Sequence, residues 1–352
     1  MSRYWSPIVN ELDPYVPGEQ PQDQQYIKLN TNESPYPPSP AVTDVLTRFD
    51  ASTLRRYPDP ESTLLVNALA DHHGLAPQQV FVGNGSDEVL AHAFQALLQK
   101  STPILFPDIS YSFYPVYCAL YRINFETVPL DADFRINVDA YQVANGGIVI
   151  PNPNAPTGIA LPLASIRQLL ESNPDSVVII DEAYVDFGAE SATSLINEFA
   201  NLLVVQTFSK SRNLAGLRLG AAFANADLIE ALQRIKNSFN SYPVDSLASA
   251  CAIASINDDA YFQQCRERVI ENRNSLAGSL TGLGFEVLPS SSNFVLASHP
   301  DRSAESLYLE LKTAGILVRY FNKPRIDNWL RITVGSDTEC ARLIAALQQV
   351  LQ

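Results

Sequence analysis

A lysine between two serines follows a run of apolar residues. The segment reads Thr-Phe-Ser-Lys-Ser over residues 207–211 and ends a β-rich run that begins at Leu202. A lone lysine is normally a solvated cation, but desolvation and a nearby cation lower the pKa of its amine. Arg218, further along the chain, is a candidate for that cation and could also bind a phosphate through its planar fork. The pattern predicts a nucleophilic amine at Lys210, suited to imine chemistry with a carbonyl group.

A glycine-containing segment is a candidate for phosphate binding. It reads Gly-Asn-Gly-Ser-Asp-Glu over residues 83–88, after a predicted strand and at the start of a predicted helix. Free backbone N–H groups and the helix dipole favour an anion there. The segment is not a Rossmann fingerprint, because Glu88 stands at the third glycine position, and it is not a P-loop, because no Gly-Lys-Ser/Thr follows. An N-capped helix with acidic residues in its first turn is the alternative interpretation.

Two more segments end predicted strands with polar or rigid residues. Residues 181–184, Asp-Glu-Ala-Tyr, close an apolar run at the edge of a parallel sheet where open α/β folds bind ligands. Alternatively, Asp181 is an N-cap or turn residue. Residues 151–158 read Pro-Asn-Pro-Asn-Ala-Pro-Thr-Gly and form either a rigid loop at a site or a Pro-rich turn.

The elements that would position these segments alternate between strands and helices. Amphipathic segments, such as residues 89–98, present one apolar helical face between the β-rich runs. This alternation predicts an α/β fold with three layers, in which helices cover both faces of a mainly parallel sheet. The predicted strands of this sheet are residues 79–82, 103–106, 126–130, 147–151, 177–181, 202–207 and 219–224.

The chain divides into three predicted parts. Residues 1–40 are rich in Pro, Gln, Asn and Asp and form an N-terminal arm that packs with a small domain. Residues 41–245 form the large domain that carries the sheet. Residues 246–352 form a smaller α+β domain, which begins with a long helix and continues with strands. Its predicted elements are a helix over residues 258–280 and strands over residues 286–288, 294–297, 316–320 and 330–334.

Composition excludes several classes of function. The 352 residues are 46% hydrophobic, but their apolar runs are far shorter than the roughly 20 residues that cross a membrane. The N-terminal residues lack the features of a secretory signal or a transit peptide, so we expect a cytoplasmic protein without a membrane partner. A net charge of −14 opposes binding to nucleic acid. The four cysteines form no C-x-x-C pair, so we expect neither a metal site nor a disulfide framework.

Together, and in this order, the four segments resemble the fold-type I pyridoxal-phosphate aminotransferases over nearly the whole chain. The resemblance implies pyridoxal 5′-phosphate held as a Schiff base on Lys210, which would also carry the proton. It implies that Asp181 keeps the pyridine nitrogen protonated, so that the ring can accept electrons, and that Tyr184 contacts the ring 3′-oxygen. At the phosphate, the remaining implied contacts are Ser86, Ser209, Arg218 and the backbone of Gly85, Ser86 and Asp87, and Tyr111 is implied to stack on the ring.

The loop at residues 151–158 departs from that family at one position. In related aminotransferases the residue before Pro-Thr-Gly is usually an Asn that hydrogen-bonds the ring 3′-oxygen, and here it is Ala155. The adjacent Asn154 is the candidate substitute, although neighbouring residues of an extended chain normally point in opposite directions.

Segments near both ends of the chain resemble the histidinol-phosphate aminotransferase family. They are residues 29–35 (Leu-Asn-Thr-Asn-Glu-Ser-Pro), 56–59 (Arg-Tyr-Pro-Asp), 292–294 (Ser-Asn-Phe) and 330–335 (Leu-Arg-Ile-Thr-Val-Gly). The resemblance implies an obligate homodimer in which Tyr57 reaches the cofactor phosphate of the neighbouring subunit. It also implies a substrate pocket lined by Tyr15, Asn30, Arg319 and Arg331. Alternatively, Tyr15 packs as an ordinary aromatic of the arm, and the two arginines are ion-paired surface groups.

The implied reaction is a ping-pong amino transfer of histidine biosynthesis. It interconverts L-histidinol phosphate and 2-oxoglutarate with imidazole-acetol phosphate and L-glutamate. Because these substrates are anionic, Arg331 would hold their carboxylate or phosphate, assisted by Arg319. An aromatic aminotransferase or a decarboxylase of a phosphorylated amino acid are alternatives on the same fold. A non-catalytic ligand-binding protein is a further alternative, against which the presence of Lys210 and Asp181 argues.

Overall fold

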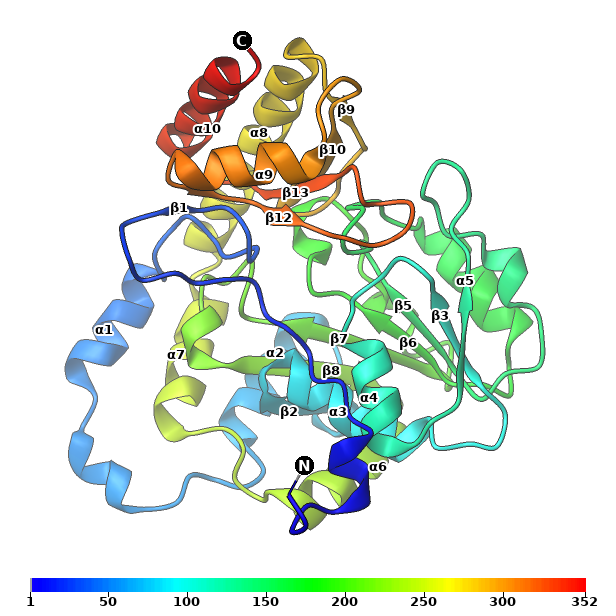
Figure 1. Cartoon of the computed structure of the whole chain (residues 1–352). Coiled ribbons are helices and arrows are strands. Elements are labelled where there is room, and N and C mark those ends of the chain that lie inside the picture. The colour runs from blue at the N-terminus through cyan, green and yellow to red at the C-terminus, as the bar shows by residue number, and fades with distance from the viewer. Residues whose placement is uncertain (1) are drawn as a thin grey trace.

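The computed structural model describes residues 2–352, and its larger part is built on a seven-stranded sheet (Figure 1). The strand order is β2-β8-β7-β6-β5-β3-β4. The five strands β7, β6, β5, β3 and β4 run parallel to one another, and β8 runs antiparallel to both β7 and β2. The bounds are β2 (Val80–Asn84), β3 (Ile104–Pro107), β4 (Phe125–Val128), β5 (Ile148–Pro151), β6 (Val178–Asp181), β7 (Leu202–Thr207) and β8 (Leu219–Ala224). The predicted α/β class with a mainly parallel sheet is confirmed.

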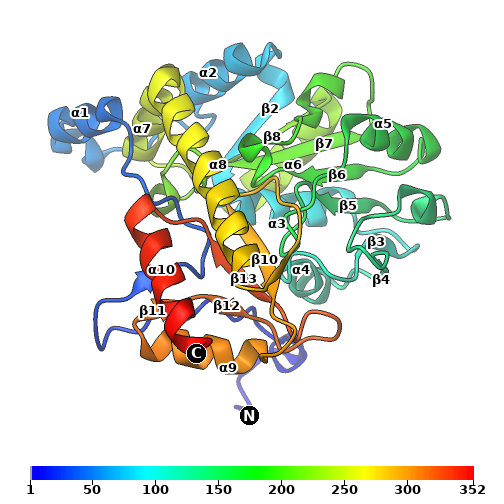
Figure 2. The ribbon, with the colours of Figure 1, turned by 90° about the horizontal axis from the view of Figure 1, so that it is seen from above.

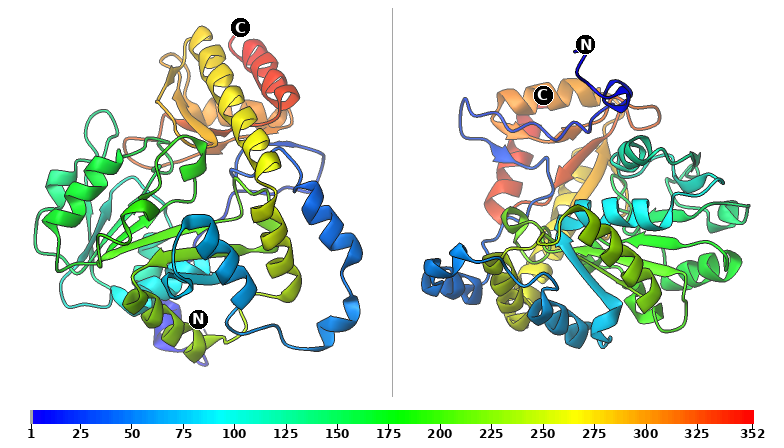
Figure 3. Two further views of the ribbon diagram at one scale, coloured as in Figure 1. Left: turned by 180° about the vertical axis from the view of Figure 1, so that it is seen from behind. Right: turned by 90° about the horizontal axis from the view of Figure 1, so that it is seen from below.

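Helices cover both faces of this sheet, which makes three layers (Figure 3). Within β5, Ile148 and Ile150 belong to the apolar cluster on one face, and Val149 belongs to the cluster on the other. A strand covered on both sides needs apolar residues at every position, which explains the continuous apolar runs of the sequence. The helices that contribute to the first cluster are α1 (Pro40–Arg48), α2 (Thr63–His73), α5 (Leu163–Ser172) and α7 (Ser246–Asn257). Those of the second cluster are α3 (Gly85–Leu97), α4 (Tyr114–Tyr121) and α6 (Ala226–Phe239).

A second, smaller sheet lies above the first and is antiparallel, with the order β12-β13-β10-β9. Its strands are β9 (Glu286–Val287), β10 (Phe294–Ser298), β12 (Arg319–Tyr320) and β13 (Leu330–Thr333). Three helices pack on it, namely α8 (Asp259–Gly282), α9 (Ala304–Thr313) and α10 (Asp337–Val350). Figure 2 shows α8 running from the large part of the molecule to the small one. Across residues 2–352, no helix combines the length and the apolar character needed to span a membrane.

The N-terminal arm runs between the two parts of the molecule. Its first helical turn, η1 (Pro7–Asn10), is followed by Tyr15, whose ring stacks on Phe113 of the large part with centroids 4.8 Å apart. Further along, Glu19 accepts hydrogen bonds from Tyr308 and Lys312 of α9. Strand β1 (Ile27–Lys28) then pairs in parallel with β11 (Ile316–Leu317). The arm therefore passes over the space between the two sheets before it joins the small one.

Helix α7 bears on the predicted boundary between residues 245 and 246. It packs against α1 and α2, and its side chains Ala248, Cys251 and Ala252 belong to an apolar cluster of the large sheet. The division at this boundary stays a prediction. The packing favours a boundary after α7, because an apolar helix is assigned best to the core in which it is buried.

Candidate active site

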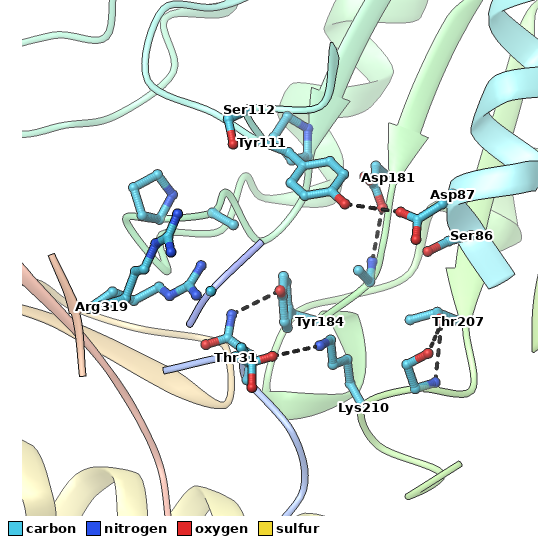
Figure 4. A pocket seen from close by; sticks show the side chains of 18 of the residues that line it. Thr31, Ser86, Asp87, Tyr111, Ser112, Asp181, Tyr184, Thr207, Lys210 and Arg319 are labelled. Carbon is cyan, nitrogen blue, oxygen red and sulfur yellow. Dashed lines mark hydrogen bonds between the residues drawn. The ribbon is translucent and has the colours of Figure 1, made fainter. Parts of the chain in front are cut away.

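A cavity of about 330 Å³ lies between the carboxyl ends of the large sheet, the arm and the small sheet (Figure 4). Parallel strands present their carboxyl ends at one edge, where open α/β sheets bind ligands. Strand β6 ends there at Asp181, and Lys210 follows shortly after the end of β7. Twelve of the predicted site residues line the cavity: Tyr15, Asn30, Ser86, Asp87, Tyr111, Asp181, Tyr184, Ser209, Lys210, Arg218, Arg319 and Arg331. Folding therefore brings together residues from both ends of the chain.

Lys210 points into this cavity and donates from Nζ to the carbonyl oxygen of Thr31, 3.1 Å away. Burial lowers the pKa of Lys210 to about 8, and the positive charge of Arg331 acts in the same direction. Arg218, the cation expected from the sequence, contributes less than Arg331. About one tenth of the amine is therefore unprotonated and nucleophilic at pH 7, far more than for an ordinary lysine.

Asp181 is a buried carboxylate with two protein donors. Tyr114 donates from its hydroxyl to Asp181 Oδ2 at 2.8 Å, and the backbone N–H of Ala183 donates to Oδ1 at 3.3 Å. Burial raises the pKa of Asp181 to about 6. A cation beside this carboxylate would favour its ionised form, which is what a protonated ring nitrogen offers. Sequence reasoning did not include Tyr114, because nothing in its local pattern distinguishes it from an ordinary core aromatic.

The start of α3 forms a cradle suited to a phosphate. Arg218 Nη2 lies 3.1 Å from Asp87 Oδ2, and Tyr111 donates to Asp87 Oδ1 at 3.0 Å. Gly85 has φ +81°, a left-handed conformation that favours glycine, and a Cβ atom there would lie 2.6 Å from Arg218 Nη2 and displace the guanidinium. A Cβ atom on Gly220 would collide with the backbone N–H of Ser86. The two glycines keep a helix N-terminus and a guanidinium open to the same space, and these groups fit the phosphate of pyridoxal phosphate.

Asn154 is not in the cavity, contrary to the expectation that it replaces the missing Asn at Ala155. Its side-chain amide donates to the carbonyl oxygen of Ile109 at 3.0 Å and to Thr157 Oγ1 at 3.1 Å. Ala155 lines the cavity instead. Pro153 and Ala155 line the cavity while Asn154 between them does not, and the amide nitrogen of Asn154 holds the loop in place.

Tyr184 accepts a hydrogen bond from Asn32, a residue to which the sequence assigned no role beyond its place in the segment 29–35. Asn32 donates from Nδ2 to Tyr184 Oη at 2.9 Å. Both residues line the cavity (Figure 4 shows Tyr184). Burial raises the pKa of the Tyr184 hydroxyl, so the phenol stays protonated and can donate.

Arg319 and Arg331 form the cationic end of the cavity. They are directly opposed on the neighbouring strands β12 and β13, an arrangement of like charges that destabilises a sheet unless an anion compensates it. Arg331 Nη2 donates to the carbonyl oxygen of Asn30 at 2.9 Å, while its buried Nε has no hydrogen-bond partner among the described residues. An unpaired buried donor is costly, which indicates that a bound anion completes this end of the site.

Tyr57 lies outside the cavity of its own chain. Its side chain is 81% exposed and stacks on Tyr242, with ring centroids 4.6 Å apart. The role predicted for Tyr57 requires a second subunit and stays a prediction.

Comparisons with known proteins identify the family. The family model "Aminotransferase class I and II" matches residues 24–347. The chain is 58% identical to histidinol-phosphate aminotransferase 2 of Dechloromonas aromatica over 99% of both chains. It is 57% identical to histidinol-phosphate aminotransferase 1 of Hydrogenovibrio crunogenus, over 100% of this chain and 99% of that protein.

Solved structures show the same fold. Histidinol-phosphate aminotransferase of Sinorhizobium meliloti, solved in complex with pyridoxal-5′-phosphate, superposes with a TM-score of 0.90 over 100% of this chain and 98% of that one, at 24% identity. A putative histidinol-phosphate aminotransferase from Erwinia carotovora atroseptica gives a TM-score of 0.85 at 26% identity, over 92% and 95% of the two chains. The chain therefore belongs to the class I and II aminotransferases, which are pyridoxal-phosphate-dependent transaminases, and within them to the histidinol-phosphate aminotransferase family.

Proposed function

We propose that this chain interconverts L-histidinol phosphate and 2-oxoglutarate with imidazole-acetol phosphate and L-glutamate, a step of histidine biosynthesis. Relatives that are more than half identical over the full length carry the name of this activity. The structural observation that supports it is the opposed pair Arg319 and Arg331, with a buried N–H of Arg331 that has no partner in residues 2–352. All four reactants carry a carboxylate or a phosphate that could satisfy these cations.

The residues of the cavity suit pyridoxal phosphate. When bound, this group supplies a carbonyl carbon that takes up the amino group and a ring that withdraws electrons from it. Lys210 would attach the cofactor, Asp181 would face its ring nitrogen, and Tyr184 would face its 3′-oxygen. At the phosphate, the remaining contacts would come from the side chains of Ser86, Ser209 and Arg218 and from the backbone N–H groups of residues 85–87. The Tyr111 ring would stack on the cofactor ring.

Lys210 would also move the proton at the reacting carbon. An amine with a pKa of about 8 is present in both protonation states near neutral pH, so it can accept a proton in one step and return it in the next. The carbonyl oxygen of Thr31 accepts a hydrogen bond from this amine and thereby orients it. The arm residues Tyr15 and Gly18 line the cavity and would exclude water when substrate is bound.

Arg331 would serve both half-reactions. A guanidinium can bind a carboxylate or a phosphate through two parallel N–H groups, so one residue could accept glutamate and histidinol phosphate in turn. Arg319 adds positive charge from the neighbouring strand.

A homodimer with shared active sites is part of this proposal. Large apolar side chains are exposed on either side of Tyr57 in the sequence: Leu54, between α1 and α2, is 60% exposed, and Leu64, at the start of α2, is 74% exposed. Such a surface is typical of a protein interface. We also infer a cytoplasmic location, with which the four free cysteines agree.

A substrate panel tests the proposal. We expect the purified enzyme to show a higher kcat/KM with histidinol phosphate than with histidinol, phenylalanine or threonine phosphate. If phenylalanine leads, the enzyme is an aromatic aminotransferase, and if threonine phosphate releases carbon dioxide, it is a decarboxylase. Either outcome would remove the specific assignment and leave the family unchanged.

A further inference from the structure

Three hydrogen bonds connect the small-domain strand β13 to the phenol of Tyr184. The backbone N–H of Asn32 lies 3.0 Å from Thr333 Oγ1, and Thr333 Oγ1 lies 3.0 Å from Asn32 Oδ1. Asn32 Nδ2 in turn lies 2.9 Å from Tyr184 Oη. Asn32 and Thr333 are each only 1% exposed, so water does not compete for these contacts. We call these three residues the relay.

The direction of every hydrogen in the relay follows from one obligatory donor. The backbone N–H of Asn32 can only donate, so Thr333 Oγ1 accepts from it and directs its own hydrogen to Asn32 Oδ1. This contact fixes the side-chain amide of Asn32 with Nδ2 toward Tyr184. Tyr184 Oη therefore accepts from Asn32, and its own hydrogen is left to be donated elsewhere. Tyr184 lines the cavity, so this hydrogen can be donated to a ligand bound there.

The backbone around Asn32 is held equally firmly. Asn32 adopts φ +56°, a left-handed conformation that asparagine tolerates better than most residues. Its carbonyl oxygen accepts from Asn293 Nδ2 at 3.0 Å, and the backbone N–H of Thr333 donates to the carbonyl oxygen of Leu29 at 2.9 Å. The relay is therefore a rigid link between the arm, the small domain and Tyr184.

We propose that Asn32 is a positioning residue that makes Tyr184 a fixed hydrogen-bond donor to the 3′-oxygen of the cofactor, with Thr333 setting the orientation of Asn32. The inference rests on the contact between Tyr184 and the cofactor given under the proposed function. It is also consistent with the wall of the cavity at Ala155, which offers only a methyl group, and with Asn154, whose amide nitrogen donates to Ile109 and Thr157. The assistance that an amide gives the 3′-oxygen in related enzymes would here reach it through Tyr184.

The relay should set the pH at which the bound cofactor changes its absorbance. A donated hydrogen bond stabilises the 3′-oxygen most when that oxygen carries the greatest negative charge, which is in the deprotonated state. Loss of the donor therefore moves the midpoint of this absorbance change to higher pH. One hydrogen bond corresponds to a shift of roughly 0.3 to 1 pH unit. The ionisable groups that face Tyr184 are Lys210, Arg331, Asp181 and Tyr15, and the variants below change none of them.

The experiment is a spectral pH titration of the holoenzyme without substrate, so its result does not depend on substrate identity. Thr333→Val removes the hydroxyl at nearly constant volume, and Thr333→Ser is the matched control that keeps it. Asn32→Gly removes the donor itself and suits the left-handed backbone, which provides a second variant if Thr333→Val folds poorly. Each variant is also made together with Tyr184→Phe.

We expect Thr333→Val, Asn32→Gly and Tyr184→Phe each to raise the midpoint, and Thr333→Ser to leave it unchanged. In the Tyr184→Phe background neither variant should shift it further, because the relay acts through the phenol. Unchanged midpoints in Thr333→Val and Asn32→Gly would overturn the proposal, and so would equal shifts in both backgrounds. An unchanged midpoint in Tyr184→Phe alone would remove the cofactor contact on which the inference depends. A failure of the substrate panel would leave all of these results intact.

Discussion

Replacing Arg331 with lysine keeps a positive charge in the cavity but removes the planar pair of N–H donors. In the structure, Arg331 uses Nη2 on the carbonyl oxygen of Asn30, and its Nε is buried without a partner among the described residues. The N–H groups of the guanidinium that are not used on Asn30 are therefore available to bind a substrate anion. A lysine offers a point charge on a flexible stem and cannot reproduce two parallel contacts.

The expected loss is that of one charge-assisted hydrogen bond, about 2 kcal/mol. At about 1.36 kcal/mol for each factor of ten, this corresponds to a roughly 30-fold decrease in kcat/KM. Because one arginine is proposed to bind both anions, the decrease should be similar for histidinol phosphate and for glutamate.

The assay measures the two half-reactions separately by rapid mixing, following the absorbance of the bound cofactor. Arg234→Lys is the matched control, because Arg234 lies on the surface in a pair with Glu230 and its side chain is 78% exposed. We expect the control to behave as the unmodified enzyme. The reasoning would be refuted if Arg331→Lys slowed only one half-reaction, since two different cations would then bind the two anions.

Four further predictions follow from the site. Borohydride reduction of the holoenzyme should attach the cofactor to Lys210, as a tryptic map would show, and a label on any other lysine would contradict the assignment. In the apoprotein, the amine of Lys210 should gain reactivity toward an acylating reagent as pH rises through about 8, because its pKa is lowered and the unprotonated form appears there. Asp181→Asn should still bind the cofactor through its phosphate contacts but lose most of its turnover, because an amide does not keep the ring nitrogen protonated; near-normal turnover would exclude that role. Asn154→Ala should leave the spectral midpoint unchanged, because Asn154 does not line the cavity, and should instead lower the free energy of unfolding by about 1 to 3 kcal/mol in a denaturant titration.

The sequence by itself determined the elements and most of the residues that meet in the cavity. Short β-rich runs predicted each of the seven strands to within a residue or two. Most of these runs are mainly apolar, because such strands are covered on both faces, whereas the edge strand β4 reads Phe-Glu-Thr-Val and is largely exposed. Ends of strands could also be predicted, and with them the places of Asp181 and Lys210. These features depend on short stretches of chain, in which the residue types alone decide the conformation.

Other features depended on contacts between residues far apart in the chain. The sequence left open which of the neighbours Asn154 and Ala155 faces the cavity, and the structure gave that place to Ala155. It could not show that Arg319 and Arg331 oppose each other, since this depends on the register of two strands. Nor could it show that Asn32 contacts Tyr184, because the direction of an amide depends on Thr333, which lies 301 positions away in the chain. Local patterns specify helices and strands, but the partner of a buried polar group is decided only when distant segments pack together and exclude water.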